Sequence, residues 1–253
     1  MKIAVVGGTG VLGKPLVAEL AGRGEEVLVL SRTVPRRLPD GASHRRVDLT
    51  TGEGLAEALA GVEVVVDASN SNPRNAGPVL VEGTKRLLRA GAESGVRHHV
   101  GISIVGCDRV PLAYYEVKVE QEEAIAAGEV PWGLLRATQF HPLIAWVFEQ
   151  AARFRVVPSG SARLQPVDPA VVVERLAGIA QADPAGRVGD LAGPEVMTLT
   201  ELARTWRTAA GRRALPLPIP MVGAVGRPVR EGALCDPGAG GGGLSFERWL
   251  ADA

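Results

Sequence analysis

The stretch "MKIAVVGGTGVLGKPLV", residues 1–17, decides the fold because it joins a short apolar run to a glycine-rich turn. Residues 2–6 are mostly apolar and rich in β-branched side chains, as in a buried parallel strand. Pro15 then lies in the first turn of a segment with helical apolar spacing, where its missing N–H group costs nothing. The stretch therefore predicts a strand, a glycine turn and a helix.

The glycines of this turn can be read in two registers. Gly8, Gly10 and Gly13 give G-x-G-x-x-G, whereas Gly7, Gly10 and Gly13 give G-x-x-G-x-x-G. Because the strand ends at Val6, Gly7 is the first residue of the turn. The second register therefore explains the expected geometry, and Gly8 is an additional small residue inside the loop.

A glycine turn of this kind suits a pyrophosphate. It allows close backbone approach, leaves N–H groups free and presents the positive end of a helix dipole. The turn predicts dinucleotide binding because it follows a strand, opens a helix and lies in a chain with further strand–helix units. The loop residues expected to contact the cofactor are Gly7, Thr9, Gly10, Val11, Leu12 and Gly13.

Expected strands and helices alternate along most of the first 140 residues. The strands are expected at 26–32, 44–49, 62–69, 98–105 and 132–136, and the helices at 54–61, 76–94 and 113–127. This alternation implies right-handed crossovers and a Rossmann-type, doubly wound parallel sheet in an α/β fold. Residues 1–155 are expected to form the NAD(P)-binding domain, and residues 156–253 a smaller C-terminal substrate lobe packed on the same unit.

The pattern of strands and helices loosens after about residue 140. A helix is expected at 198–211, opened by a Thr-x-x-Glu capping box that begins at Thr198. Loops around residues 157–163 and 216–230 are expected to close over an apolar substrate.

Composition narrows the classes of partner. The chain has 28 Lys plus Arg and 28 Asp plus Glu, so no net field attracts nucleic acid or an anionic membrane. The longest apolar runs fall far short of the about 20 residues that a membrane span needs. Cys107 and Cys235 are the only cysteines and have no CxxC or histidine neighbour, which predicts a cytoplasmic protein without a metal site. A small molecule is the expected partner.

The end of strand 26–32 indicates which dinucleotide is bound. In such folds an acidic residue here favours NAD, and an arginine favours NADP. Ser31 and Arg32 lie at the end of this strand, whereas the nearby acids Glu25 and Glu26 lie before it. The sequence therefore predicts NADP(H), with Ser31 and Arg32 beside the 2′-phosphate.

Two later strand ends are expected to border the cofactor, because ligands bind outside the carboxyl ends of the strands. Asp48 can accept a hydrogen bond from the adenine amino group, and Leu49 can cover the adenine ring. Ala68, Ser69 and Asn70 lie where the ribose and diphosphate should pass.

Tyr114 and Lys118 are four residues apart on an expected helix, so their side chains point the same way. A tyrosine with a pKa of roughly 10 exchanges protons poorly at neutral pH, but an adjacent ammonium lowers the pKa of the phenol. With its pKa lowered, Tyr114 can pass a proton to or from a substrate oxygen. Ser103 on the preceding strand can hold that oxygen, and Lys118 can also bind the nicotinamide ribose. Tyr115, three residues before Lys118, competes with Tyr114 for the role.

Several segments together carry a family resemblance: "VVGGTGVLGKPLV", the strand with Ser103, "YYEVK", "LLRATQFHPL", "LQPVDPAVVVERL" and "LSFERWLA". They resemble the NmrA-like, NAD(P)H-binding branch of the atypical short-chain dehydrogenase/reductase family. The resemblance implies that Ser103, Tyr114 and Lys118 are the catalytic set, with Tyr114 as acid/base because it completes Y-x-x-x-K. It also implies that Gln139 and Phe140 lie by the nicotinamide.

The same resemblance implies an NADPH-dependent reductase that transfers hydride to a carbonyl, quinone or enone of a small, largely apolar substrate. Two alternatives stay open: a non-catalytic NADP(H) sensor, and an epimerase or dehydratase that retains its cofactor. His141 is a candidate for the substrate pocket, whereas Trp146, Phe148 and Phe154 are expected in the core because of their apolar helical surroundings. The sequence leaves the oligomeric state open, with a homodimer as one option because long helices beside such sheets often pair two subunits.

Overall fold

The structure, a computed structural model, describes residues 1–252. The chain forms two compact units. The first unit consists of residues 1–103, 116–135 and 173–188; the second consists of residues 104–115, 136–172 and the part from Gly189 onward. Each unit is thus assembled from three stretches, because the chain passes repeatedly from one to the other. The sequence predicted two continuous parts divided at residue 155, and that functional division stays a prediction.

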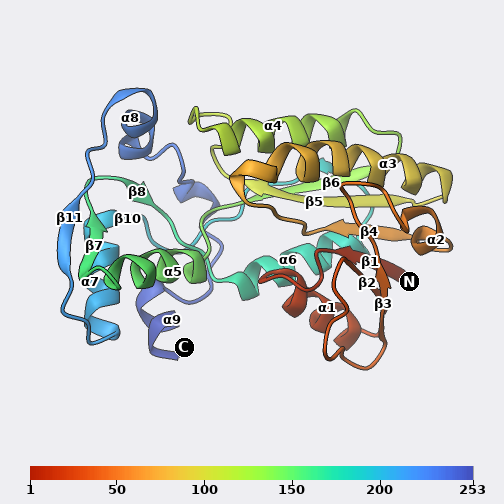
Figure 1. Cartoon of the computed structure of the whole chain (residues 1–253), viewed down its shortest axis with the longest axis horizontal. Coiled ribbons are helices and arrows are strands. Elements are labelled where there is room, and N and C mark those ends of the chain that lie inside the picture. The colour runs from red at the N-terminus through yellow and green to blue at the C-terminus, as the bar shows by residue number, and fades with distance from the viewer. Residues whose placement is uncertain (253) are drawn as a thin grey trace. The chain divides into compact units, whose positions relative to one another are not determined.

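The first unit is built on a seven-stranded sheet with the order β3-β2-β1-β4-β5-β6-β9 (Figure 1). Its strands are β1 (Lys2–Val6), β2 (Glu26–Ser31), β3 (Ala42–Arg46), β4 (Val64–Asp67), β5 (His98–Ile104), β6 (Trp132–Ala137) and β9 (Gly186–Arg187). The first strand pairs in parallel with β2 on one side and β4 on the other, so the strand order reverses at β1. The predicted doubly wound parallel sheet is confirmed, and its reversal point is where such sheets bind ligands.

Helices cover both faces of this sheet. They are α1 (Gly13–Gly22), α2 (Leu55–Leu59), α3 (Gly83–Glu93), α4 (Ala113–Ala126) and α6 (Pro169–Gln181). Figure 1 shows α3 and α4 on one face and α1 and α6 on the other. Strand β4 between these layers is buried along its whole length, which explains its continuous apolar sequence.

The long helix expected at residues 76–94 is only partly regular. A 3₁₀ turn at Pro73–Asn75 and a π-helical turn at Gly77–Glu82 precede α3, which begins at Gly83. Pro78 lies in the π-helical turn and has no N–H group to donate. Apolar periodicity alone did not distinguish this irregular entry from the helix that follows it.

Two small sheets and several helices lie in the described part of the second unit. Strand β7 (Val156–Ser159) pairs in parallel with β11 (Leu215–Pro218), and β8 (Arg163–Leu164) pairs antiparallel with β10 (Met197–Thr198). The helices are α5 (His141–Ala152), α7 (Leu199–Ala209), α8 (Gly223–Glu231) and α9 (Phe246–Asp252). The predicted capping box at Thr198 is confirmed at the start of α7.

The prediction that two segments form substrate-covering loops is wrong, because both segments contain regular secondary structure. Residues 157–163 include most of β7, and residues 216–230 include most of β11 and of α8. Each strand is only four residues long and pairs with a partner far away in the sequence, so neither segment has a periodic signal of its own.

The aromatic residues around α5 divide between core and surface. Phe148 is fully buried against Trp206, as expected. Trp146 and Phe154 are 55% and 80% exposed, so their expected place in the core is wrong. Trp146 is two positions from Phe148, about 200° around the helix, and Phe154 lies beyond its end. Among the described residues, no helix is long and apolar enough to cross a membrane.

Candidate functional site

The glycine turn has the geometry of the G-x-x-G-x-x-G register. Gly7 adopts φ +71°, and a Cβ atom on it would lie 2.7 Å from the Ala68 carbonyl oxygen at the end of β4. A Cβ atom on Gly13 would lie 2.2 Å from the Gly7 carbonyl oxygen. The Gly10 amide donates to that same oxygen at 2.9 Å. These three glycines therefore close the turn on itself and against β4.

The turn offers unpaired polar groups to a ligand. Among residues 1–252, the backbone amides of Thr9, Val11 and Leu12 donate to no protein acceptor. They precede α1, where the helix dipole favours negative charge. Beside the turn, the hydroxyl of Ser69 is buried and has no hydrogen-bond partner in the described chain. A backbone that a Cβ atom would obstruct, open amides and an orphaned hydroxyl fit a dinucleotide diphosphate.

Ser31 and Arg32 occupy the end of β2 as expected. The Ser31 hydroxyl donates to the Thr33 carbonyl oxygen at 2.8 Å and lies 3.1 Å from Nε2 of His44. The Arg32 side chain is exposed and makes no ion pair within the described residues. Of the two, Arg32 is thus the side chain available to a 2′-phosphate.

Asp48 and Leu49 follow β3 and differ in their surroundings. The Asp48 carboxylate accepts the Thr50 amide at 2.8 Å, which folds the turn after the strand. Leu49 belongs to the core of the first unit and packs closely on Gly83 of α3. Its packing role is therefore established, and its contact with an adenine ring stays a prediction.

Ser103 and Lys118 meet at the carboxyl end of β5. Ser103 is buried in that strand. Lys118 on α4 is 5% exposed, and its ammonium donates to the Ile102 carbonyl oxygen at 2.8 Å. This bond ties Lys118 to the residue that precedes Ser103 in β5, and a shared catalytic role of Ser103 and Lys118 stays a prediction.

Gln121 holds Lys118 from inside the first unit and is itself held by Thr84 and Asp67; none of these three residues was predicted to belong to the site. The Lys118 ammonium also donates to Oε1 of Gln121. Nε2 of Gln121 donates to the Thr84 hydroxyl at 3.0 Å and to the Asp67 carboxylate at 3.4 Å. Thr84 donates to Asp67 at 3.2 Å, and the Ser69 amide donates to it at 3.0 Å. A buried carboxylate is thus linked to the buried lysine through one amide side chain.

Part of this network had a signal in the sequence. Gln121 is three residues after Lys118, so the two share a face of α4. Asp67 ends an otherwise apolar strand, and a carboxylate buried there needs hydrogen-bond partners inside the protein. The hydrogen bonds between Gln121 and Asp67 were not predictable, because the two residues lie on different elements and Thr84, which bonds to both, lies on a third.

Tyr114 and Tyr115 begin α4, with ring centroids 6.4 Å apart. Burial raises the pKa of Tyr114 above its usual value, so the lowering expected from Lys118 is wrong. Burial likewise raises the pKa of Tyr115, and Cys107 and Tyr114 add to the effect. Tyr115 also packs on an apolar cluster of the second unit, which gives it a structural role that favours Tyr114 as the acid.

Gln139, Phe140 and His141 follow β6 in the second unit. The side-chain Nε2 of Gln139 donates to the Leu234 carbonyl oxygen at 3.1 Å, and its Oε1 accepts from the backbone N–H of Gln165 at 3.1 Å. The Gln139 side chain therefore links two segments of the second unit. Phe140 caps α5. Contact of either residue with a nicotinamide stays a prediction.

His141 does not line an open pocket as expected. It is fully buried and hydrogen-bonds the Leu244 carbonyl oxygen at 2.9 Å. Its ring also packs on Phe246 and Trp249. The segment that covers it lies about one hundred residues further along the chain, beyond what local spacing can indicate.

Comparison with known proteins shows that the chain is related to NAD(P)H-binding proteins. A family described as NAD(P)H-binding matches residues 7–142, which include the glycine turn, Lys118 and Phe140. Two solved structures share the fold over 99% of this chain. They are a nucleoside-diphosphate-sugar epimerase of Staphylococcus aureus, at 18% identity, 100% of its length and a TM-score of 0.81, and an NADPH-dependent quinone oxidoreductase of Escherichia coli complexed with NADPH, at 19% identity, 99% of its length and a TM-score of 0.80.

A closer relative in sequence is the 3-beta-hydroxysteroid dehydrogenase of Mycolicibacterium neoaurum. It is 34% identical over 187 residues, which cover 62% of this chain and 50% of that protein. The chain spans between about one tenth and one half of the length of the first curated relatives it matches.

Proposed function

Because the chain belongs to the NAD(P)H-binding family, whose relatives include oxidoreductases, we propose that it is an NADPH-dependent reductase of a carbonyl, quinone or enone. The observation that carries the proposal is the buried Lys118 ammonium, held beside Ser103 at the carboxyl end of β5. Its hydrogen bonds to Ile102 and Gln121 hold the ammonium at the edge of the sheet where dinucleotides bind. We place the nicotinamide ribose beside it.

Bound NADPH supplies a hydride to the electrophilic carbon of the substrate. The chain supplies everything else: the glycine turn and Ser69 hold the diphosphate, and Arg32 holds the 2′-phosphate. Lys118 binds the ribose hydroxyls, and Gln139 and Phe140 border the nicotinamide ring. Preference for NADP over NAD rests on Arg32, because β2 has no acidic residue at its end.

The proton goes from the Tyr114 hydroxyl to the substrate oxygen while Ser103 holds that oxygen by a hydrogen bond. Burial raises the pKa of Tyr114, so the phenol carries the proton to be donated throughout the neutral range. Because both cysteines are buried and unbridged, we also place the protein in the cytoplasm, and we retain a homodimer as a prediction.

The test follows loss of absorbance at the reduced-nicotinamide band with a panel of quinones, enones and ketones. We expect turnover with at least one class and tight NADPH binding by cofactor fluorescence. Lys118→Met should raise the NADPH Kd by about tenfold or more, because a charged hydrogen bond is lost. The matched control, Lys85→Met, removes an exposed lysine on α3 and should leave the Kd unchanged.

The same assay decides between the proposal and its alternatives. Tight binding of NADPH without turnover across the whole panel identifies the non-catalytic sensor and overturns the reductase. Product formation with no net consumption of NADPH identifies an epimerase or dehydratase instead. An unchanged NADPH Kd in Lys118→Met would remove this lysine from the cofactor site.

A further inference from the structure

Two segments of the second unit carry basic residues and no acidic ones. Residues 150–167 contain three arginines and residues 202–230 contain six, and neither segment contains an aspartate or a glutamate. The charge of the whole chain is balanced, and for that reason no attraction to an anionic membrane was expected. The balance conceals a local excess of positive charge, because the acidic residues lie elsewhere in the chain.

The two segments lie side by side in the structure. Strand β7 belongs to the first segment and β11 to the second, and they pair in parallel with Val156 opposite Leu215. The Leu215 amide also donates to the Arg155 carbonyl oxygen at 2.8 Å. The residues just before the two strands, 153–155 and 212–214, are therefore neighbours. They bring together four arginines: Arg153, Arg155, Arg212 and Arg213.

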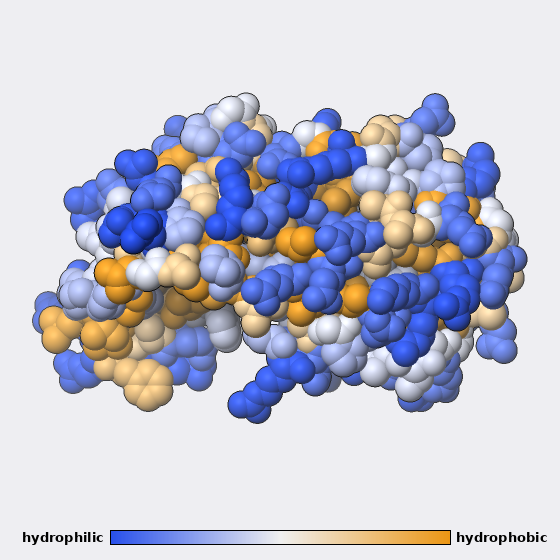
Figure 2. Space-filling model, turned by 90° about the horizontal axis from the view of Figure 1, so that it is seen from above, coloured by the Kyte–Doolittle hydropathy of each residue, from blue (hydrophilic) through white to orange (hydrophobic). Residues whose placement is uncertain are grey.

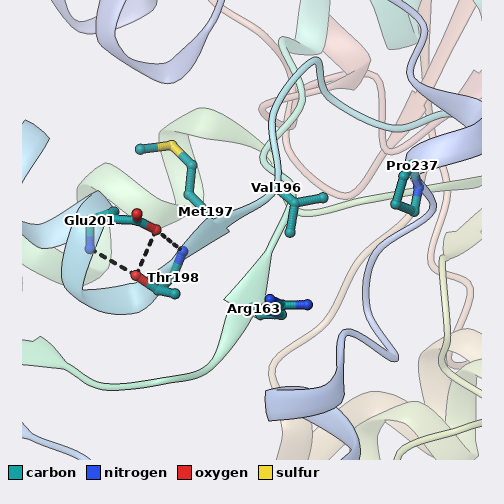
Figure 3. Close-up of a pocket in the computed structure, with 6 residues that line it drawn as sticks. All are labelled: Arg163, Val196, Met197, Thr198, Glu201 and Pro237. Atoms are coloured by element: carbon teal, nitrogen blue, oxygen red, sulfur yellow. Dashed lines mark hydrogen bonds between the residues drawn. The ribbon is translucent and has the colours of Figure 1, made fainter.

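These four arginines are available to an anionic partner. All four are exposed, and no carboxylate of the described residues lies within 4.0 Å of their guanidinium groups. The remaining arginine of the first segment, Arg163, has different surroundings. It lies on β8 and lines a separate cavity together with Glu201, to which it is attracted (Figure 3).

Large apolar side chains are exposed among the four arginines. Phe154 lies between two of them and is 80% exposed, and Leu215, two residues after Arg213, is 72% exposed. Further along the same segment, Leu217 and Val222 are 48% and 70% exposed. Figure 2 shows apolar residues next to hydrophilic ones on this unit, at the left of the view. Exposed apolar side chains bordered by charged ones indicate an interaction surface.

The backbone of β11 is closed to a further strand. Among the described strands, β11 pairs only with β7. Leu215 and Ile219 donate their amides to the segment of β7, whereas Pro216 and Pro218 between them have no N–H group to offer on the free edge. An added strand would find no donors there, so a partner must bind the side chains of this surface.

We propose that the surface formed by residues 153–155 and 212–222 attaches the protein to an anionic lipid bilayer. The arginines bind the lipid phosphate groups, and Phe154 and Leu215 insert at the boundary between headgroups and acyl chains. A second copy of this chain does not fit, because pairing the surface with itself would bring together four arginines from each copy and no acid. A nucleic acid would leave the apolar side chains uncovered. The attachment goes beyond the proposed reductase reaction and does not depend on it.

The test is co-sedimentation of the full-length protein with vesicles. One set consists of phosphatidylcholine alone, and the other of equal parts of phosphatidylcholine and phosphatidylglycerol. The surface variants are Phe154→Ser and the double variant Arg212→Gln/Arg213→Gln. The matched control is Arg163→Gln, which removes an arginine of the same unit from the separate cavity. Circular dichroism checks that every variant is folded.

We expect the wild type to bind the anionic vesicles and not phosphatidylcholine alone. The double variant should weaken this binding by roughly twentyfold, because each arginine near an anionic surface contributes about fivefold. Phe154→Ser should weaken it about tenfold, because a buried aromatic ring is lost. Arg163→Gln should leave it unchanged.

Three results would overturn the proposal. The first is no binding of the wild type to the anionic vesicles, and the second is an unchanged affinity in both surface variants. The third is binding to soluble polyglutamate in place of the vesicles, which would identify an acidic polypeptide as the partner. None of these results bears on the NADPH assays, so the reductase is tested independently.

Discussion

Tyr114 shows how burial changes the protonation behaviour that sequence spacing predicts. The sequence places it four residues before Lys118, which predicted a lowered pKa and an easily formed phenolate. The pKa is raised instead, because burial disfavours the charged phenolate. The spacing showed which residues share a helix face. The direction of the pKa shift depends on how deeply the phenol is buried, and burial cannot be read from spacing.

The raised pKa predicts the pH dependence of reduction. The folded-state pKa of Tyr114 lies above its ordinary value of roughly 10, so the phenol stays protonated through the whole neutral range. We expect kcat for reduction to be flat between about pH 6 and pH 9 as far as this proton is concerned. A fall in kcat with a midpoint near pH 7 to 8, absent in Tyr114→Phe, would contradict the assignment of a raised pKa.

Arg32 is expected to determine the choice of dinucleotide. Arg32→Ala should raise the Kd of NADPH by roughly ten- to a hundredfold, the usual loss for a charged hydrogen bond, and leave the Kd of NADH unchanged. Arg37→Ala is the matched control, since Arg37 is also exposed and lies further along the same loop. Cofactor fluorescence titrations measure both constants. Equal effects of Arg32→Ala on the two cofactors would remove Arg32 from the 2′-phosphate site.

At the scale of elements, β4, α3 and α4 cooperate to hold one lysine. Asp67 ends β4, Thr84 lies in the first turn of α3, and Gln121 shares a face of α4 with Lys118. A buried carboxylate and a buried ammonium compensate each other through an intervening amide, which leaves the ammonium at the edge of the site. Gln121 is therefore a positioning residue for Lys118.

This arrangement predicts different outcomes for two substitutions. Gln121→Met removes one of the acceptors of Lys118 and a donor to Asp67. We therefore expect a loss of about 1–3 kcal/mol in the free energy of unfolding and a higher KM for NADPH. Thr84→Val removes only the hydroxyl and should lower stability with little change in that KM. Denaturant unfolding and steady-state kinetics measure the two effects. Equal KM values in both variants would make Gln121 merely structural.

The elements that the sequence predicted and those that it missed differ in how local their signals are. Strands β1, β2, β4, β5 and β6 were predicted within a few residues, since a fully buried strand has a continuous apolar run bounded by turn residues. Strands β7 and β11 were missed, because each becomes a strand only by pairing with the other. The glycine turn was predicted in the right register because its strand ends at Val6.

At the scale of the whole molecule, burial of ionisable groups affects stability toward acid. His98 and His99 are buried in the first unit and His141 in the second. Burial lowers the pKa of all three, and that of His99 falls to about 4. Protonating any of them inside the fold costs free energy that the unfolded chain does not pay.

The sign of the resulting pH dependence follows from these shifts. Below the ordinary histidine pKa of roughly 6.5, the unfolded chain takes up protons that folded His99 does not accept until about pH 4. The free energy of unfolding should therefore fall as pH drops through this window, by up to roughly 1.4 kcal/mol per pH unit for this residue. Denaturant unfolding at pH 7, 6 and 5 should show a smaller slope in His99→Gln. An identical slope in that variant would contradict the prediction.

Turnover by two conservative variants decides whether Tyr114 is the proton donor. With a ketone or enone substrate and saturating NADPH, Tyr114→Phe should lower kcat by roughly 10²- to 10⁴-fold, as expected for a lost general acid, while the NADPH Kd stays unchanged. Tyr115→Phe, its neighbour at the start of the same helix, should retain kcat near the wild-type value. Wild-type turnover in Tyr114→Phe, or loss of turnover only in Tyr115→Phe, would contradict the account.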